Sequence, residues 1–260
     1  AMIHGLPETG RPHDQILADL KAFGGQDPHY REARTWSLVY YLDEDYENFL
    51  KEAYGTYFSA NGLNPMAFKS LKHLEREVLH TTSDLLHGDD QVCGVMTSGG
   101  TESCLLAVKT YRDRGYAHGI RAPEMVIPES GHVAWEKGGE YFGVKIRHAA
   151  LTKDMHVDLA SVRSLVNRNT VMILGSAPDY PHGMIDPIED LGRLAQEKGV
   201  PLHVDACVGG YLLPFLERIG VSLPLWDFRV PGVSSISAYI HKYGFAAKGA
   251  SCILYRRLED

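Results

Sequence analysis

From residue 91 onward, short apolar runs alternate with amphipathic stretches, and this alternation restricts the possible folds more than any other feature of the chain. The apolar runs are residues 92–96, 125–127, 144–146, 171–174, 202–204, 235–237 and 252–255. Stretches with helical spacing lie between them, at residues 102–114, 133–141, 159–166 and 188–197. Strands that alternate with helices predict an α/β fold with a mostly parallel seven-stranded sheet and helices on both faces.

The part of the chain before residue 91 has a different character. Residues 44–57 and 66–86 show the spacing of apolar residues that is typical of amphipathic helices. Residues 1–35 are polar and rich in glycine, proline and charge, and we expect an irregular arm there. We therefore expect an N-terminal arm with lead-in helices over residues 1–60 and a large domain over residues 61–260.

The charge balance and the cysteines exclude several classes of function. The 260 residues carry a formal charge of −7, which disfavours a nucleic-acid partner. No stretch approaches the roughly 18 consecutive apolar residues of a membrane-spanning helix. The four cysteines lack the spacing of a zinc site, so we expect no metal and reduced thiols in a cytoplasmic protein.

The strand expected at residues 92–96 is followed by the run Thr-Ser-Gly-Gly-Thr-Glu-Ser and then by a helix. Backbone N–H groups at such a helix start can bind an anion, and Gly100 would let a ligand approach closely. A simple turn with Thr101 as the N-cap is an equally good interpretation. The chain contains no P-loop, no Gly-x-Gly-x-x-Gly dinucleotide motif and no Gly-x-Ser-x-Gly nucleophile motif.

Three further polar residues follow expected strands. His132 stands at a helix start, where it could bind a ligand or merely cap the helix. Asp205 ends an apolar strand, where a carboxylate needs either a cation or a capping role. Lys242 lies among apolar and aromatic residues; such surroundings make an amine nucleophilic, although most lysines are simply solvated.

The combination of these features is more specific than any one of them, because together they are the parts that pyridoxal 5′-phosphate requires. The helix start would take the phosphate. Asp205 would keep the pyridine nitrogen protonated, His132 would stack on the ring, and Lys242 would form the Schiff base.

Several segments of the chain together resemble one enzyme family. They are residues 53–55, 64–65, 97–103, 131–134, 176–183, 203–210, 241–244 and 248–249. At these positions the chain is similar to the fold-type I pyridoxal-phosphate enzymes of the group II decarboxylase superfamily. The runs at 176–183 and 204–210 favour its sphingosine-1-phosphate lyases over its amino-acid decarboxylases. The resemblance implies an aspartate aminotransferase-like large domain, in a chain without the small C-terminal domain of that family.

The resemblance also implies a role for each matching residue. The implied catalytic residues are Lys242, Tyr180 and His132; the implied cofactor-binding residues are Gly100, Thr101, His132, Asp205, Cys207, His241 and Lys242; and the implied substrate-binding residues are Tyr40, Asn64 and Lys248. Two positions depart from the family pattern. Tyr239 stands where related lyases usually carry aspartate, and Asn64 stands where several carry histidine.

The implied reaction is a retro-aldol cleavage of a phosphorylated sphingoid base, sphingosine 1-phosphate, to a long-chain aldehyde and phosphoethanolamine. The resemblance implies a soluble bacterial enzyme that acts as a homodimer without a membrane helix. Two alternatives remain open. One is a pyridoxal-phosphate-dependent decarboxylase for a tyrosine- or glutamate-like amino acid. The other is an inactive or incomplete chain of the same fold that acts only as a binding or assembly module.

Overall fold

The computed structural model describes residues 5, 8–35 and 38–259 of the chain. They fall into two packing units, Ala1–Glu47 and Asn48–Asp260. The functional boundary at residue 60 rests on the sequence alone and stays a prediction. Within the described residues, none of the helices combines the length and the apolar character that crossing a membrane requires.

The N-terminal unit contains helical structure that the sequence analysis did not anticipate. It holds α1 (His13–Gly24), the 3-10 helix η1 (Tyr30–Glu32) and the start of α2 (Glu44–Thr56), which continues into the second unit. The expectation of irregular structure over residues 1–35 is therefore wrong for α1. Ile16, Leu20 and Phe23 recur at helical spacing there, but the polar residues and prolines around them obscure the pattern.

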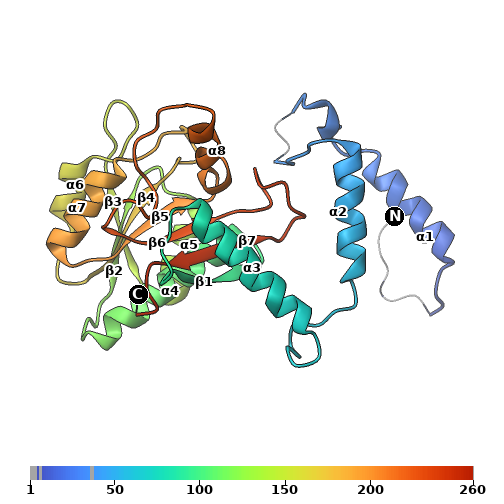
Figure 1. Ribbon diagram of the computed structural model, residues 1–260, viewed down its shortest axis with the longest axis horizontal. Helices are drawn as coiled ribbons and strands as arrows, with labels where there is room; N and C mark the ends of the chain where they lie inside the picture. Colours follow the sequence, from blue (N-terminus) through green and yellow to red (C-terminus); the bar gives the residue numbers. More distant parts are fainter. Residues whose placement is uncertain (1–4, 6–7, 36–37, 260) are drawn as a thin grey trace. The chain divides into compact units, whose positions relative to one another are not determined.

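A seven-stranded sheet forms the centre of the second unit (Figure 1). Its strands are β1 (Cys93–Thr97), β2 (Glu124–Pro128), β3 (Lys145–Ala149), β4 (Thr170–Ser176), β5 (Leu202–Ala206), β6 (Val233–Ala238) and β7 (Ser251–Tyr255). They lie in the order β1-β7-β6-β5-β4-β2-β3. Only β7 is antiparallel to its neighbours, β1 and β6. The predicted mostly parallel sheet is confirmed.

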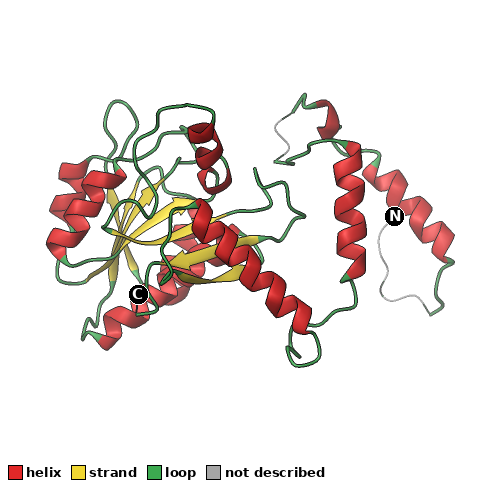
Figure 2. Ribbon diagram, in the orientation of Figure 1, coloured by secondary structure: helices red, strands yellow, loops and turns green. Residues whose placement is uncertain are grey.

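Helices cover both faces of this sheet, as predicted (Figure 2). They are α3 (Lys69–Leu85), α4 (Gly100–Ala117), α5 (Val133–Phe142), α6 (Leu159–Leu165), α7 (Ile188–Lys198) and α8 (Leu213–Arg218), with the 3-10 helix η2 (Gly209–Tyr211). Helices α4 and α5 pack on one face, and α3, α6, α7 and α8 pack on the other. Neighbouring strand residues alternate between the two cores: Val126 and Ile173 face one, whereas Met125 and Met172 face the other.

Two local features explain where helices begin and end. The helix predicted from residue 66 begins instead at Lys69, because Asn64 organises a turn before it: Asn64 Oδ1 accepts a hydrogen bond from Ala67 N over 3.1 Å. Helices α5 and α7 both end at a glycine in the left-handed region, Gly143 with φ of 64° and Gly199 with φ of 65°. Glycine adopts this conformation without a steric penalty, so it is the usual residue at such ends.

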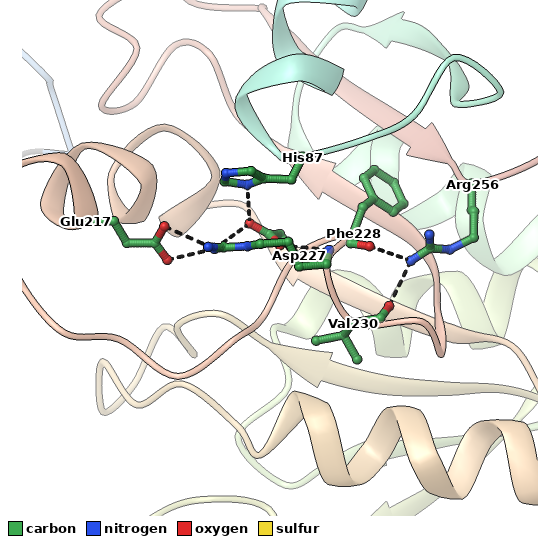
Figure 3. A network of polar contacts seen from close by, with 7 residues as sticks. His87, Glu217, Asp227, Phe228, Val230 and Arg256 are labelled. Carbon is green, nitrogen blue, oxygen red and sulfur yellow. Dashed lines mark hydrogen bonds and ion pairs between the residues drawn. The ribbon is translucent and has the colours of Figure 1, made fainter.

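Charged side chains anchor the segment that leads from α8 into β6 (Figure 3). The carboxylate of Asp227 is fully buried, and Arg229 donates to its two oxygens over 2.8 and 2.9 Å. The same guanidinium contacts Glu217 at 2.8 Å, and His87 Nδ1 lies 2.9 Å from Asp227 Oδ2. A buried carboxylate is tolerated only with partners of this kind.

Arg256 fixes the same segment from the end of β7 (Figure 3). Its Nη2 donates to the carbonyl oxygens of Phe228 and Val230 over 2.9 and 2.8 Å, and its Nε donates to that of Val233 over 2.6 Å. These contacts join the beginning of β6 to the end of β7. Strand β6 leads directly to Lys242 at its other end, so they help to position the candidate site.

Candidate active site

The carboxyl ends of several strands lie at one edge of the sheet, and the predicted site residues follow them. Strands β1 and β6 run in the same direction because both are antiparallel to β7, and β6, β5, β4 and β2 are parallel. Ligands of such sheets bind beyond these ends. One pocket there is lined by five of the predicted residues: His132, Tyr180, Asp205, Cys207 and Lys242.

Asp205 is held from two sides at the end of β5. It is 6% exposed. The indole Nε1 of Trp135 donates to Asp205 Oδ2 over 3.0 Å, and the backbone N–H of Cys207 donates to Oδ1 over 3.1 Å. Such donors stabilise a buried carboxylate in its charged form. Trp135 is not among the residues predicted from the sequence, although it lies on α5 about one turn after His132.

His203 supports this arrangement from within the core. Its ring lies edge-on to Trp135, with 5.1 Å between the ring centroids. Its Nδ1 and Nε2 pair with the hydroxyls of Ser235 and Ser237 at 2.7 and 3.2 Å. Burial lowers the pKa of His203 to about 4, against the opposing effect of the Asp205 charge, so the ring is neutral at pH 7.

His132 both caps α5 and borders the pocket. Its Nδ1 accepts a hydrogen bond from the N–H of Ala134 over 3.1 Å, so the capping role is real. The ring also lies edge-on to Tyr180, with 6.1 Å between the centroids. Tyr180 is 53% exposed, so this pair forms the solvent-facing wall of the pocket. The cap fixes the imidazole where a bound ring could contact it.

Helix α4 begins with glycine. Gly99 is the N-cap residue and Gly100 is the first helical residue, so the capping residue has no side chain. The alternative with Thr101 as the N-cap is wrong, because Thr101 is the second helical residue and is exposed. Glu102 accepts two hydrogen bonds of 2.6 Å from Ser98, which lower its pKa. The first N–H groups of a helix lack partners within it, so this helix start suits an anion.

Lys242 lies in the turn after β6 with other basic residues nearby. Its Nζ is 4.6 Å from the centroid of the Tyr239 ring. The neighbouring His241 donates from Nδ1 to the carbonyl oxygen of Ala250 over 2.7 Å, and burial lowers the pKa of this imidazole. Lys248 is exposed, and partial burial together with the charge of Lys242 lowers its pKa. An anionic ligand would relieve the repulsion between these lysines.

The two remaining predicted residues come from the first quarter of the chain. Tyr40 is half-buried within the N-terminal unit. Asn64 is exposed in the turn before α3, where its side chain binds Ala67 N. The structure therefore does not bring Asn64 to the pocket lined by Asp205 and Lys242.

Two thiols lie beside the carboxylate of the site. The ligand atoms of Cys104, Asp205 and Cys207 all lie within 4.8 Å of one another. Burial raises the pKa of the Cys207 thiol well above its ordinary value. At neutral pH the Cys207 side chain is therefore a thiol and not a thiolate.

The polar groups of the pocket fit pyridoxal phosphate in kind. The buried carboxylate of Asp205 suits a pyridinium, the start of α4 at Gly100 suits a phosphate, and the Lys242 amine suits an aldehyde. The space, however, is filled by Tyr239, which lines the same pocket and leaves a cavity of only about 20 Å³. The donor set thus fits the cofactor, and the position of Tyr239 determines whether there is room for it.

Known proteins resemble this chain over nearly all of its length. It is 43% identical to sphingosine-1-phosphate lyase 1 of Mus musculus over 96% of this chain and 44% of that protein. The solved structure of a sphingosine-1-phosphate lyase of Burkholderia pseudomallei matches 99% of this chain and 61% of its own, with a TM-score of 0.92 and 39% identity. A glutamate decarboxylase of Lactobacillus brevis shares the fold, with a TM-score of 0.83 and 23% identity over 98% of this chain and 61% of its own.

The chain spans about half the length of the curated relatives it matches, 44% in the case of the mouse protein. The sequence profile of the pyridoxal-dependent decarboxylase conserved domain matches residues 45–260. This match includes every residue that lines the pocket at the sheet edge. The chain therefore belongs to the pyridoxal-dependent decarboxylase family, whose cofactor is pyridoxal phosphate.

Proposed function

We propose that this chain carries the cofactor site of a lyase that cleaves phosphorylated sphingoid bases such as sphingosine 1-phosphate. The products would be a long-chain aldehyde and phosphoethanolamine. The observation that carries the proposal is the gathering of His132, Asp205 and Lys242 around one pocket, in a chain whose relatives bear the name sphingosine-1-phosphate lyase.

Different residues around the pocket would bind different parts of the cofactor. Asp205, with Trp135 behind it, would hold the ring nitrogen, and Cys207 would lie beside the ring. The backbone at Gly100 and Thr101, helped by His241, would bind the phosphate. When bound, pyridoxal phosphate supplies a ring that accepts the electron pair of the broken bond.

The solvent side of the pocket would handle the substrate. Tyr180 is half exposed and contacts His132, so its phenol oxygen can exchange a proton with the substrate hydroxyl and with water. The Lys242 amine would hold the cofactor through its aldehyde group beside this pair. The exposed ammonium of Lys248 would bind the substrate phosphate. The assignment of Tyr40 and Asn64 as substrate-binding residues rests on the sequence resemblance alone.

The proposal includes a cytoplasmic homodimer. The four cysteines are free thiols, as expected in a reducing compartment. Helix α1 has no buried residue, and its apolar residues Ile16, Leu17, Leu20 and Phe23 are all exposed. An exposed apolar stripe of this kind suits a partner surface. Sedimentation equilibrium, with and without pyridoxal phosphate, would measure the mass of the assembly.

The test is product analysis with the cofactor present. The protein is incubated with pyridoxal phosphate and a phosphorylated sphingoid base, and aldehyde and phosphoethanolamine are quantified by mass spectrometry. We expect both products in equal amounts, and neither from Lys242→Ala. Release of CO₂ from tyrosine or glutamate without any aldehyde from the sphingoid base would assign the chain to the amino-acid decarboxylases instead.

A further inference from the structure

Tyr239 lies inside the pocket that the cofactor requires. It directly follows β6 and is only 8% exposed. The Lys242 Nζ lies 4.6 Å from its ring centroid, and the His241 ring lies 5.7 Å away at an angle of 33°. The phenol oxygen is 3.9 Å from Cys104 Sγ. The aromatic side chain is thus enclosed by the groups that would otherwise contact the cofactor.

The phenol also covers the start of α4. A Cβ atom built on Gly100 would lie 1.3 Å from Cζ of Tyr239 and 1.5 Å from its hydroxyl oxygen. The ring therefore packs directly against the glycine whose backbone would receive the phosphate. Burial raises the pKa of this phenol, so the group at the helix start is neutral.

The space that remains is far too small for a second aromatic ring. The cavity between Tyr239, Asp205 and Lys242 measures about 20 Å³. Such a volume holds one water molecule. A pyridine ring with its phosphate cannot enter while the phenol stays in place.

The rest of the pocket does not depend on the phenol. Asp205 is fixed by Trp135 and by a backbone N–H, and His132 is fixed as the cap of α5. The glycine start of α4 is fixed by the backbone. Withdrawal of the Tyr239 side chain would therefore open a preformed site.

We propose that Tyr239 occupies the cofactor pocket as an internal competitor, and that pyridoxal phosphate binds only after this side chain has moved out. The proposal rests on the cofactor that the family binds and is independent of the substrate. Pyridoxal phosphate then binds a minor open conformation. Such minor states are commonly populated at about 0.1–10%. The apparent affinity equals the affinity of the open conformation multiplied by its populated fraction. Removal of the ring should raise the affinity at least about 10-fold.

The test compares the native chain with Tyr239→Ala and with a matched control, Tyr239→Phe. The alanine variant empties the pocket, whereas the phenylalanine variant keeps the ring and loses only the hydroxyl. Binding of pyridoxal phosphate is titrated by absorbance and by calorimetry. We expect the alanine variant to bind at least about 10-fold more tightly than the native chain, and the phenylalanine variant to bind like the native chain.

Stopped-flow kinetics provide a second measurement, which depends mainly on the native chain. If the ring must leave first, the observed binding rate of the native chain reaches a plateau as the cofactor concentration rises. In Tyr239→Ala any plateau should lie at a higher rate, because the ring no longer has to leave first. Circular dichroism verifies that each variant is folded at the temperature of the titration.

Three results would overturn the proposal: equal affinities of the native chain and Tyr239→Ala, an equal gain in Tyr239→Phe, or no plateau in the native chain. Absence of binding in every protein would refute it as well, because the pocket would then not be a cofactor site. Normal cofactor binding without aldehyde formation would refute the proposed lyase activity and leave the role of Tyr239 intact.

Discussion

Replacement of Trp135 with phenylalanine removes the indole N–H that holds Asp205 and leaves an aromatic ring in the core. Trp135 is fully buried, and its Nε1 donates to Asp205 over 3.0 Å. A hydrogen bond to a charged group contributes about 1.5–3 kcal/mol. The smaller ring also leaves a cavity, which adds its own cost.

Trp226 provides a control for the cavity. It is fully buried as well, and its Nε1 has no hydrogen-bond partner among the residues that the structure describes. Trp226→Phe therefore removes a similar volume without removing a hydrogen bond. We expect Trp135→Phe to cost about 2 kcal/mol more than Trp226→Phe in the free energy of unfolding, within the range of about 1.5–3 kcal/mol for such a hydrogen bond.

Urea unfolding followed by circular dichroism measures both variants, and equal slopes of the unfolding free energy against urea would validate the comparison. In a domain of this size ~2 kcal/mol corresponds to a difference in Tm of about 4–8 °C. Pyridoxal phosphate should also bind more weakly to Trp135→Phe than to Trp226→Phe. Equal losses of stability, or a larger loss in Trp226→Phe, would refute the assignment of Trp135 as the residue that positions Asp205.

Three further changes test other parts of the structure. Arg229→Met leaves the carboxylate of Asp227 buried without its cation and should cost about 3–5 kcal/mol in urea unfolding, whereas Arg163→Ala breaks an exposed ion pair and should cost less than ~1 kcal/mol. The pKa of His203 is about 4 in the folded chain and ordinarily 6.5, so the unfolded chain binds the extra proton between these values. Its contribution to stability should fall by up to ~3 kcal/mol as the pH drops from 6.5 to 4, and His203→Gln should lack this loss. Gly209→Ala would bring a Cβ within 2.0 Å of a backbone carbonyl oxygen in the loop after β4, and differential scanning calorimetry should show a lower Tm.

Each of these expectations has a contrary outcome. Similar losses in Arg229→Met and Arg163→Ala would show that the buried pair is no stronger than an exposed one. Burial raises the pKa of Asp186 to about 6, so this residue favours folding as the pH falls and opposes His203. The decisive comparison is therefore His203→Gln against the native chain at each pH, and parallel curves would contradict the assignment. An unchanged Tm in Gly209→Ala would mean that the loop after β4 moves to make room for the Cβ atom without a loss of stability.

The sheet could be predicted because its strands are buried on both faces. All residues of β4 are buried. A strand that is buried on both faces appears in the sequence as a short apolar run, and in β4 this run is Val171–Leu174. The residues at the strand ends were predictable for a related reason, since His132, Asp205 and Lys242 each interrupt an apolar context close to a strand end.

Contacts between distant residues could not be predicted in this way. Trp135 and Asp205 are 70 positions apart, and neither local sequence indicates that the indole N–H reaches the carboxylate. Tyr239 could be recognised as a departure from the family pattern, but the direction of its ring depends on the space above Gly100. Helix α1 escaped prediction because its apolar residues lie exposed in polar surroundings, where periodicity is a weak signal.

Strand β7 gives the candidate site a particular order of assembly during synthesis. Strand β1 stands at the sheet edge and pairs with β7, the last of the seven strands to be made. The start of α4, where we propose that phosphate binds, therefore cannot settle beside the Lys242 turn until Ser251–Tyr255 has been synthesised. Until then the backbone groups of β1 that face β7 are unpaired, and unpaired strand edges of this kind favour aggregation.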